Sequence, residues 1–239
     1  MQPTGGLRER KKERTRRLIS TAAWRLFVAR GFEQVTVADV AESAEVSEGT
    51  VFNYFRTKEG LVFDGMEGFY AAMLDEIRTR AAGESALTAF GRFMLRQPEE
   101  PRATDVGEVI AESARLIAAS PLLLAREAEI VDTNAHLLAN LLARETGADP
   151  ADPEPLAAAQ ALMAVHRTLL FSIRRAAVAG ERGQALTDVA ANCTRRALAV
   201  VGAGLQDYAI RADRNVGSEG ADADSTKAVD FHATKHHDH

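Results

Sequence analysis

The spacing of apolar residues along the chain predicts helices and no strands. Leu18, Ala22 and Phe27 fall on one face of a helix over residues 7–30, and Gly31 follows where a glycine commonly ends a helix. No segment alternates apolar and polar residues with the two-residue period of a strand. Glycine, proline and serine separate the further helical segments, which are expected at about 36–43, 47–53, 58–80, 85–96, 105–118, 121–146, 155–179 and 184–210.

The segment over residues 36–61 reads as two short helices, a tight turn and the start of a third helix. Thr36 and Asp39 have the spacing of a capping box, and Ser47 is placed to cap the second helix. Two helices joined by such a turn form the helix-turn-helix unit, whose second helix enters the major groove of DNA. The residues expected on the buried side of that second helix are Val51, Phe52 and Phe55.

This segment lies within the string GFEQVTVADVAESAEVSEGTVFNYFRTKEGLV, which resembles the N-terminal signature of the TetR family of bacterial repressors. The resemblance covers about residues 8–65. A lone helix-turn-helix pattern is weak, but here many positions match at fixed spacing. They are Gly31, Phe32, Thr36, Val37, Ala41, Ala44, Val46, Ser47, Gly49, Thr50, Tyr54, Phe55, Lys58 and Glu59.

The resemblance implies an all-α fold with two domains. A three-helix, helix-turn-helix DNA-binding domain is expected over residues 7–57, and a larger helical ligand-binding and dimerisation domain over residues 58–210. Residues 1–6 and the polar residues 211–239 are expected to be disordered. The implied function is that of a homodimeric repressor. It would bind a palindromic operator in double-stranded DNA and release it when a small-molecule effector enters the larger domain.

The second helix of the motif, residues 47–55, carries the residues expected to read DNA. Gly49 lets the backbone approach closely, Thr50 suits a phosphate or a thymine methyl group, and Asn53 can bind adenine through its amide. Alternatively, Thr50 and Asn53 are only solvated polar residues. Tyr54 can reach a phosphate, and Lys58 adds a phosphate site at a helix N-terminus. The expected DNA-binding set is Thr36, Ser47, Gly49, Thr50, Asn53, Tyr54 and Lys58.

Three residues depart from the family pattern. Glu45 stands in the turn where the family usually has glycine, and a left-handed backbone there would cost about 1–2 kcal/mol. Glu48 suits the helix dipole but repels phosphate, unless it accepts from a cytosine amino group. Phe52 replaces a common tyrosine, so one hydroxyl contact to phosphate is expected to be missing.

The charge distribution favours nucleic-acid binding although the formal net charge of the chain is −5. Within residues 1–17, seven Lys or Arg residues stand against two Glu residues. Such a run is often only a solvated face. Beside a helix-turn-helix we expect it to strengthen binding to any DNA sequence by counterion release.

Other features exclude rather than assign functions. With Cys193 as the one cysteine, no internal disulfide can form, which fits a cytoplasmic location. No apolar run long enough to span a bilayer and no signal peptide is recognised, so no membrane partner is expected. Enzyme motifs such as HExxH, CxxC and GxSxG are missing, and neither a catalytic site, a cofactor nor a metal site is expected. Histidines 232, 236, 237 and 239 are interpreted as part of a disordered or added tail rather than as metal ligands.

Residues 69–175 are expected to hold the effector pocket if the resemblance holds. The region has no cluster of charges suited to a phosphate or carboxylate, so a hydrophobic or aromatic effector is expected. The rival interpretation is a constitutive DNA-binding or protein-interaction module without an effector, in which the same residues are ordinary core. The inward-facing candidates are Phe69, Met73, Phe90, Phe93, Met94, His136, His166 and Phe171.

Two further expectations concern assembly and switching. The helices over about 155–179 and 184–210 are expected to pair with those of a second copy as a four-helix bundle. The helix over about 58–80 is expected to connect the two domains and to shift when the effector binds, because Gly60, Gly65 and Gly68 weaken it. Alternatively, these glycines only permit close packing. The apolar candidates for the dimer seam are Leu162, Leu169, Leu186, Val189, Leu198 and Val201.

Overall fold

The computed structural model describes residues 6–96, 106–149 and 151–211, and all regular elements in these ranges are α-helices. The predicted all-α class is confirmed. In chain order the helices are α1 (Leu7–Arg30), α2 (Val37–Ser43), α3 (Glu48–Tyr54), α4 (Lys58–Val62), α5 (Met66–Arg78), α6 (Ala86–Met94), α7 (Val106–Ala118), α8 (Pro121–Thr146), α9 (Glu154–Val178) and α10 (Gly183–Leu205).

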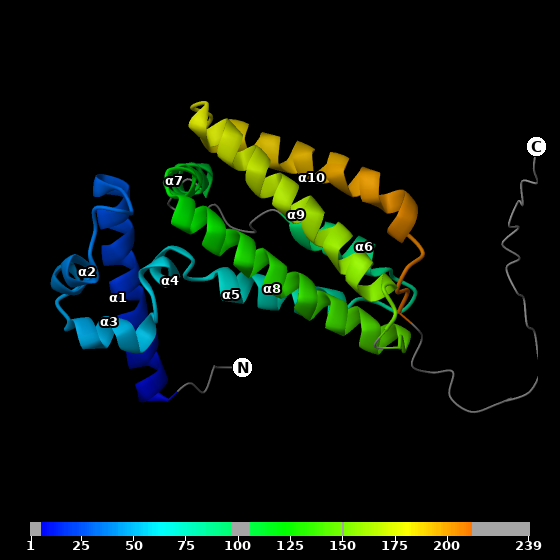
Figure 1. Ribbon diagram of the computed structural model, residues 1–239, viewed down its shortest axis with the longest axis horizontal. Helices are drawn as coiled ribbons and strands as arrows, with labels where there is room; N and C mark the ends of the chain where they lie inside the picture. The colour runs from blue at the N-terminus through cyan, green and yellow to red at the C-terminus, as the bar shows by residue number, and fades with distance from the viewer. Residues whose placement is uncertain (1–5, 97–105, 150, 212–239) are drawn as a thin grey trace, which may run out of the picture.

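Helices α1 to α4 form a small body at one end of the molecule (Figure 1). Its core is built from residues that recur on one face of each helix, among them Ile19 and Phe27 of α1, Val40 of α2 and Val51 of α3. Leu61 of α4 is buried in the same cluster. The domain boundary expected between residues 57 and 58 therefore falls inside a shared core.

The single helix expected over residues 58–80 is wrong, because the chain breaks between α4 and α5. Gly65 precedes α5 with φ of +91°, a left-handed conformation that glycine adopts without steric cost. Gly60 lies within α4, whereas Gly68 lies in the first turn of α5. The three glycines therefore do not weaken one continuous helix.

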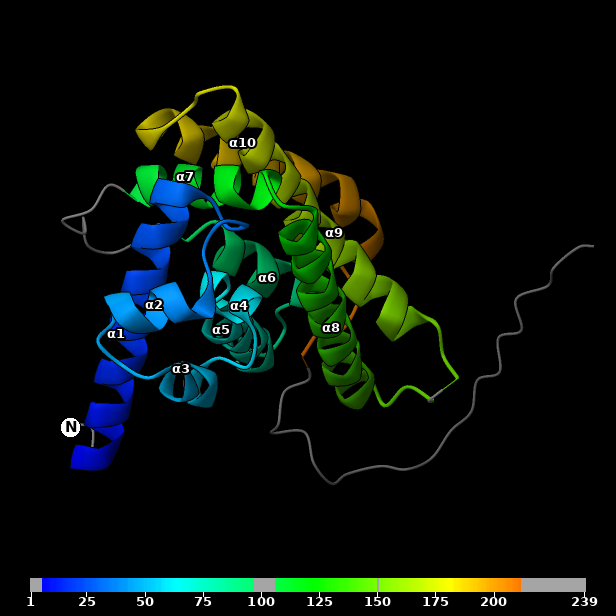
Figure 2. The same ribbon diagram turned by 60° about the vertical axis from the view of Figure 1, so that its left-hand side comes forward.

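Helices α5 to α10 form the larger body, in which α8, α9 and α10 run side by side (Figures 1 and 2). Its main core includes Tyr70, Phe90, Leu138, Leu162 and Met163, all almost fully buried. Helix α9 packs against α7, α8 and α10, so its apolar residues are needed on more than one face.

One described helix, α9, is long and apolar enough to cross a bilayer by length and composition. The sequence-based expectation that no segment reaches this limit is therefore wrong. Packing against α7, α8 and α10 explains part of this composition, and exposed apolar residues such as Phe171 and Val178 account for the rest.

The corner between α7 and α8 joins the two bodies. Leu116 and Ile117 near the end of α7 and Leu123 in α8 are buried in the same cluster as the core of the small body. Ser120, which caps α8, donates a hydrogen bond to Glu33 Oε1 at 2.6 Å. The small body is thus fixed to the wall of the larger one by apolar packing and one polar link.

The expected disorder of the two ends lies almost entirely outside the described residues. Two residues of those ranges are described. Gly6 precedes α1, and Arg211 exchanges backbone hydrogen bonds with Gly83 and Glu84 after α5. Arg211 therefore belongs to the folded body, where the sequence had suggested the start of a tail.

Two of the residues expected in a dimer seam lie inside the protomer. Leu162 and Leu186 are almost completely buried, the first in the main core and the second between α7, α9 and α10. Leu198 and Val201 pack partly against the main core, and Leu169 borders a cavity. Apolar periodicity could not separate these internal contacts from an outward face.

Candidate nucleic-acid interface and ligand cavity

The caps of α2 and α3 hold the helix-turn-helix together. Thr36 accepts a hydrogen bond from the Asp39 amide at 3.1 Å, and the Asp39 carboxylate accepts from the Thr36 amide at 2.7 Å, so the predicted capping box is present. The Thr36 hydroxyl also donates to the Asp39 carboxylate at 2.6 Å, and this bond, with the one from the Thr36 amide, holds the pKa of Asp39 below its usual value. Ser47 caps α3 by accepting from the Thr50 amide at 3.1 Å. Thr36 and Ser47 therefore shape the motif, whatever further contacts they make.

The turn between α2 and α3 carries the predicted strain. Glu45 has φ of +54°, which lies in the left-handed region that a non-glycine residue seldom occupies. Its side chain is exposed. The Glu45 carboxylate therefore lies in solvent beside α3, the helix predicted to read DNA and called the reading helix below.

The exposed side of α3 carries Glu48, Gly49, Phe52 and Asn53. The expectation that Phe52 is buried is wrong, because its side chain is 48% exposed. Residues four apart share a helix face, so Phe52 lies with Glu48, and Asn53 lies with Gly49. An exposed aromatic ring here suits apolar contact with a thymine methyl group, which the expected burial of Phe52 had left out of account.

Thr50 and Tyr54 are half-buried on the flank of α3. The Thr50 hydroxyl lies 2.9 Å from that of Ser47, so these two side chains form a linked pair at the start of the helix. Tyr54 packs partly against the core of the small body. Asn53 is therefore the more exposed of the polar residues predicted to contact bases.

Lys58 does not present its ammonium freely, contrary to the predicted phosphate contact. Its Nζ donates to the carbonyl oxygens of Phe32 at 3.0 Å and Val35 at 3.1 Å, and it lies 4.0 Å from the centre of the Phe32 ring. The side chain therefore ties the start of α4 to the segment that precedes α2. No local sequence signal distinguishes this internal role from a surface one.

The basic run on α1 is divided between solvent and structure. Arg8, Arg10, Lys11, Lys12 and Arg14 are exposed. By contrast, the Arg16 guanidinium binds the Asp64 carboxylate at 2.7 Å and lies over the Phe55 ring. The free part of the run is thus the first half of α1, while the next turn anchors α1 to the break between α4 and α5.

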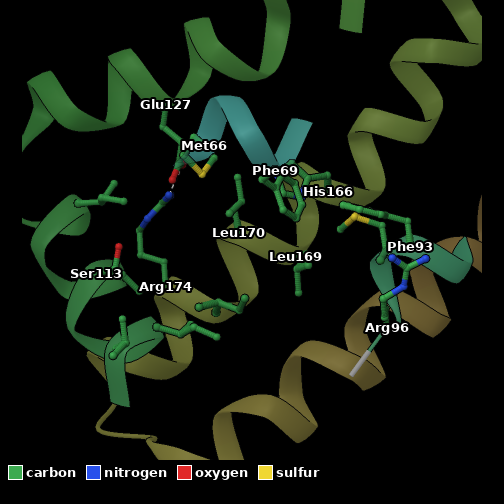
Figure 3. Close-up of a pocket in the computed structure, with 16 residues that line it drawn as sticks. Met66, Phe69, Phe93, Arg96, Ser113, Glu127, His166, Leu169, Leu170 and Arg174 are labelled. Carbon is green, nitrogen blue, oxygen red and sulfur yellow. Dashed lines mark hydrogen bonds and ion pairs between the residues drawn. The ribbon is translucent and has the colours of Figure 1, made fainter. Parts of the chain in front are cut away.

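The larger body contains a cavity of about 550 Å³ between α5, α6, α7, α8 and α9 (Figure 3). This volume lies within the range of pockets that hold drug-sized ligands. Most of the lining side chains are apolar. The lining residues are Met66, Phe69, Phe93, Met94, Arg96, Val109, Ile110, Ser113, Ala114, Ile117, Glu127, His166, Leu169, Leu170, Ile173 and Arg174.

The structure brings together half of the residues predicted to form a pocket. Phe69, Phe93, Met94 and His166 line the cavity. Met73 and Phe90 point inward but are fully buried in the main core and do not border the cavity. For His136 and Phe171 the inward orientation is wrong, since both are exposed on the outer faces of α8 and α9.

The polar lining residues were missed apart from His166. Glu127 of α8 and Arg174 of α9 form a largely buried ion pair at one end of the cavity. At the other end His166 stacks on Phe69, with ring centres 5.5 Å apart, and its Nε2 lies 3.1 Å from the Tyr70 hydroxyl. Glu127 and Arg174 could have been predicted from the sequence, because each is a charged residue that interrupts an otherwise apolar helix face.

Burial lowers the pKa of His166 to about 4. The unfolded state then binds a proton near pH 6.5 that the folded state excludes, so stability falls as pH drops below that value. We expect His166→Gln to remove about 2 kcal/mol of the stability loss between pH 7 and pH 5. Urea unfolding at both pH values checks this, and equal losses in both proteins would contradict it.

Comparisons with known proteins agree with this architecture. Residues 19–64 match the family model for bacterial regulatory proteins of the tetR family. The HTH-type transcriptional regulator TcmR of Streptomyces glaucescens is 33% identical over 152 residues, which are 62% of this chain and 67% of that protein. The uncharacterized HTH-type transcriptional regulator YvkB of Bacillus subtilis is 44% identical over 48 residues, 20% of this chain and 25% of that one. The solved structure of the fatty acid degradation regulator FadR from Bacillus halodurans is 18% identical with a TM-score of 0.49, over 82% of this chain and 97% of that chain.

The match to TcmR spans two thirds of that protein. The matched relatives are named as transcriptional regulators and not as enzymes. The chain therefore belongs to the TetR family of DNA-binding transcriptional regulators, as the residues of its first third had suggested.

Proposed function

We propose that the protein is a cytoplasmic, ligand-responsive repressor that binds a palindromic operator as a homodimer. The observation that most supports this proposal is that α7 contributes both to the cavity and to the core of the helix-turn-helix body. Ile117 of α7 lines the apolar cavity and is also buried in the core of the helix-turn-helix body. A ligand that moves α7 would therefore move the reading helix as well.

In this proposal the break between α4 and α5 is a second connection between the cavity and the DNA-binding body. Met66, at the start of α5, borders the cavity and packs against the small body. It follows directly on Gly65, and Asp64 before it accepts hydrogen bonds from Arg16 and Ser20 of α1. We propose that the effector acts through α7 and through this break, in place of a shift of one long helix.

The proposed dimer forms through the outer faces of α9 and α10. Phe171 and Val178 of α9 and Val200 of α10 are 61%, 63% and 81% exposed. Large apolar side chains exposed on adjacent helices favour a partner surface. Regulators of this family bind DNA as homodimers. A Phe171→Glu, Val200→Glu double variant should sediment as a folded monomer, and an unchanged dimer would contradict this placement.

Operator release tests the function as a whole. Palindromes upstream of the gene should be bound by the purified protein in a gel-shift titration, with two protomers per site. A ring compound that fits the cavity should lower operator affinity in a saturable manner. Binding that no small molecule alters would favour the rival, a constitutive DNA-binding module.

Asn53→Ala is expected to relax the preference at one base pair of each half-site by about 1–3 kcal/mol. The reason is that Asn53 is exposed on α3, where its amide can pair with an adenine edge. Competition binding with single-base operator variants measures this. Lys12→Ala is the control, because loss of an exposed charge on α1 should weaken all sequences equally. Equal weakening of specific and random DNA by Asn53→Ala would contradict the assignment.

A further inference from the structure

The polar groups of the cavity differ between its two ends. At one end, His166 is stacked on Phe69 and paired with Tyr70. At the other, Glu127 and Arg174 form their ion pair, and Figure 3 draws Ser113 on the same side of the cavity as Arg174. Apolar side chains such as Leu169 and Leu170 lie between the two ends in the same view. A ligand that fills the cavity must therefore be apolar along its length.

Arg174 has hydrogen-bonding capacity that the described residues do not use. One terminal nitrogen donates to the Glu127 carboxylate, while Nε is buried and has no partner within the described part of the chain. A guanidinium stays protonated, so Nε–H is always a donor. A buried donor without a partner costs about 1–3 kcal/mol. A ligand can recover this free energy only by supplying an acceptor.

The charges near this donor are already balanced. Glu127 neutralises Arg174, and Arg96 at the opposite end is paired with Glu76 outside the lining. His166 adds no positive charge near neutral pH, because burial lowers its pKa to about 4. A ligand carboxylate at Arg174 would stand beside the carboxylate of Glu127 in a site of low dielectric, where like charges repel strongly.

We infer that the effector is an uncharged, largely aromatic molecule with a hydroxyl or carbonyl oxygen, and that this oxygen binds at the Glu127–Arg174 ion pair. The inference rests on the proposed function and narrows the class of effector. A hydroxyl can donate to Glu127 while it accepts from Arg174, and a carbonyl can accept from Arg174 alone. The aromatic part lies against Leu170 and Phe69.

Three probes with the same ring system test the inference: phenanthrene, 9-phenanthrol and phenanthrene-9-carboxylate. Binding to the full chain is followed by the fluorescence of the ring. We expect 9-phenanthrol to bind at least about tenfold more tightly than either of the others, which corresponds to about 1.4 kcal/mol. Equal affinity for phenanthrene and 9-phenanthrol, or tightest binding of the carboxylate, overturns the inference.

Two variants at the ion pair give opposite expectations. The double variant Glu127→Leu, Arg174→Met removes both the acceptor and the donor for the hydroxyl, so 9-phenanthrol should lose its advantage over phenanthrene. Glu127→Gln keeps the shape and leaves Arg174 without a counter-charge, so the carboxylate should become the tightest ligand. The control is Asp132→Asn, which breaks the exposed Arg167–Asp132 pair between the same two helices and should change no affinity. Loss of the oxygen preference in His166→Gln but not in Glu127→Leu, Arg174→Met would place the oxygen at the opposite end of the cavity and overturn the assignment.

Folding and function are checked separately. Circular dichroism reports whether each variant is folded, and the charge-neutral double variant Glu127→Leu, Arg174→Met serves alone if Glu127→Gln is not. Persistence of the 9-phenanthrol advantage in this double variant overturns the inference. If phenanthrene binds as tightly as 9-phenanthrol and causes the same release of operator, the inference is overturned and the proposed repressor function stands. If the wild-type protein binds none of the three probes, the result contradicts both the inference and the proposed function.

Discussion

Lys58→Met is expected to lower the free energy of unfolding of the helix-turn-helix body by about 2–3 kcal/mol and to weaken operator binding more than tenfold. Its ammonium donates to the carbonyl oxygens of Phe32 and Val35, and hydrogen bonds from charged donors contribute about 1.5–3 kcal/mol each when well enclosed. The lower end applies because Lys58 is half-buried. Without these bonds the segment before α2 loses its support.

Arg56→Met is the matched control for Lys58→Met. Arg56 is exposed, and its loss removes the same unit of charge two residues away. Trp24 is the only tryptophan and lies in α1, so its fluorescence reports on unfolding of the small body during a urea titration. Superimposable unfolding curves for Lys58→Met and the wild type would restore the simpler idea of a surface phosphate contact.

Gly107→Ala is expected to lower the stability of the larger body by about 3 kcal/mol or more. A Cβ at Gly107 would lie 2.5 Å from the Cα of Gly183, so backbone meets backbone and no side chain can turn aside. Helix α7 would have to move away from the start of α10. Because α7 also lines the cavity, ligand affinity should fall together with the midpoint of thermal unfolding measured by circular dichroism.

Gly68→Ala is the control for Gly107→Ala. No atom lies within 4 Å of a Cβ built at Gly68, which stands in the first turn of α5 with an ordinary helical φ. Alanine there should leave stability unchanged or raise it by up to about 1 kcal/mol, through its helix propensity. A Gly107→Ala protein that melts at the wild-type temperature would show that α7 and α10 adjust without cost.

Helix ends were predictable where the sequence itself supplies the cap. Thr36 and Ser47 start α2 and α3 as expected, and Gly147 ends α8 with a left-handed backbone. The break at Gly65 was missed, because a glycine inside an apolar run is compatible both with a weak helix and with a change of direction. Only packing against α1 decides between these outcomes.

Side-chain roles were less predictable than helices. Phe52 and Val51 are neighbours of similar hydrophobicity, yet one is exposed and the other buried, since the packing of α3 against α2 selects the face. The cavity draws on five helices whose relative positions no local pattern encodes. His166 was among the candidates predicted to face inward, but Phe69 and Tyr70, which orient it, lie far away in sequence.

Ile117 has a consequence for how the family could diversify. The same side chain shapes the volume available to the ligand and fills part of the core of the small body, so a substitution there that admits a larger molecule also loosens the DNA-binding body. New ligand preferences should therefore accumulate on α6 and α9, at positions such as Phe93 and Leu170, which border the cavity and pack only against the larger body. Directed evolution of this protein into a sensor for another compound would be most productive from a library restricted to that wall.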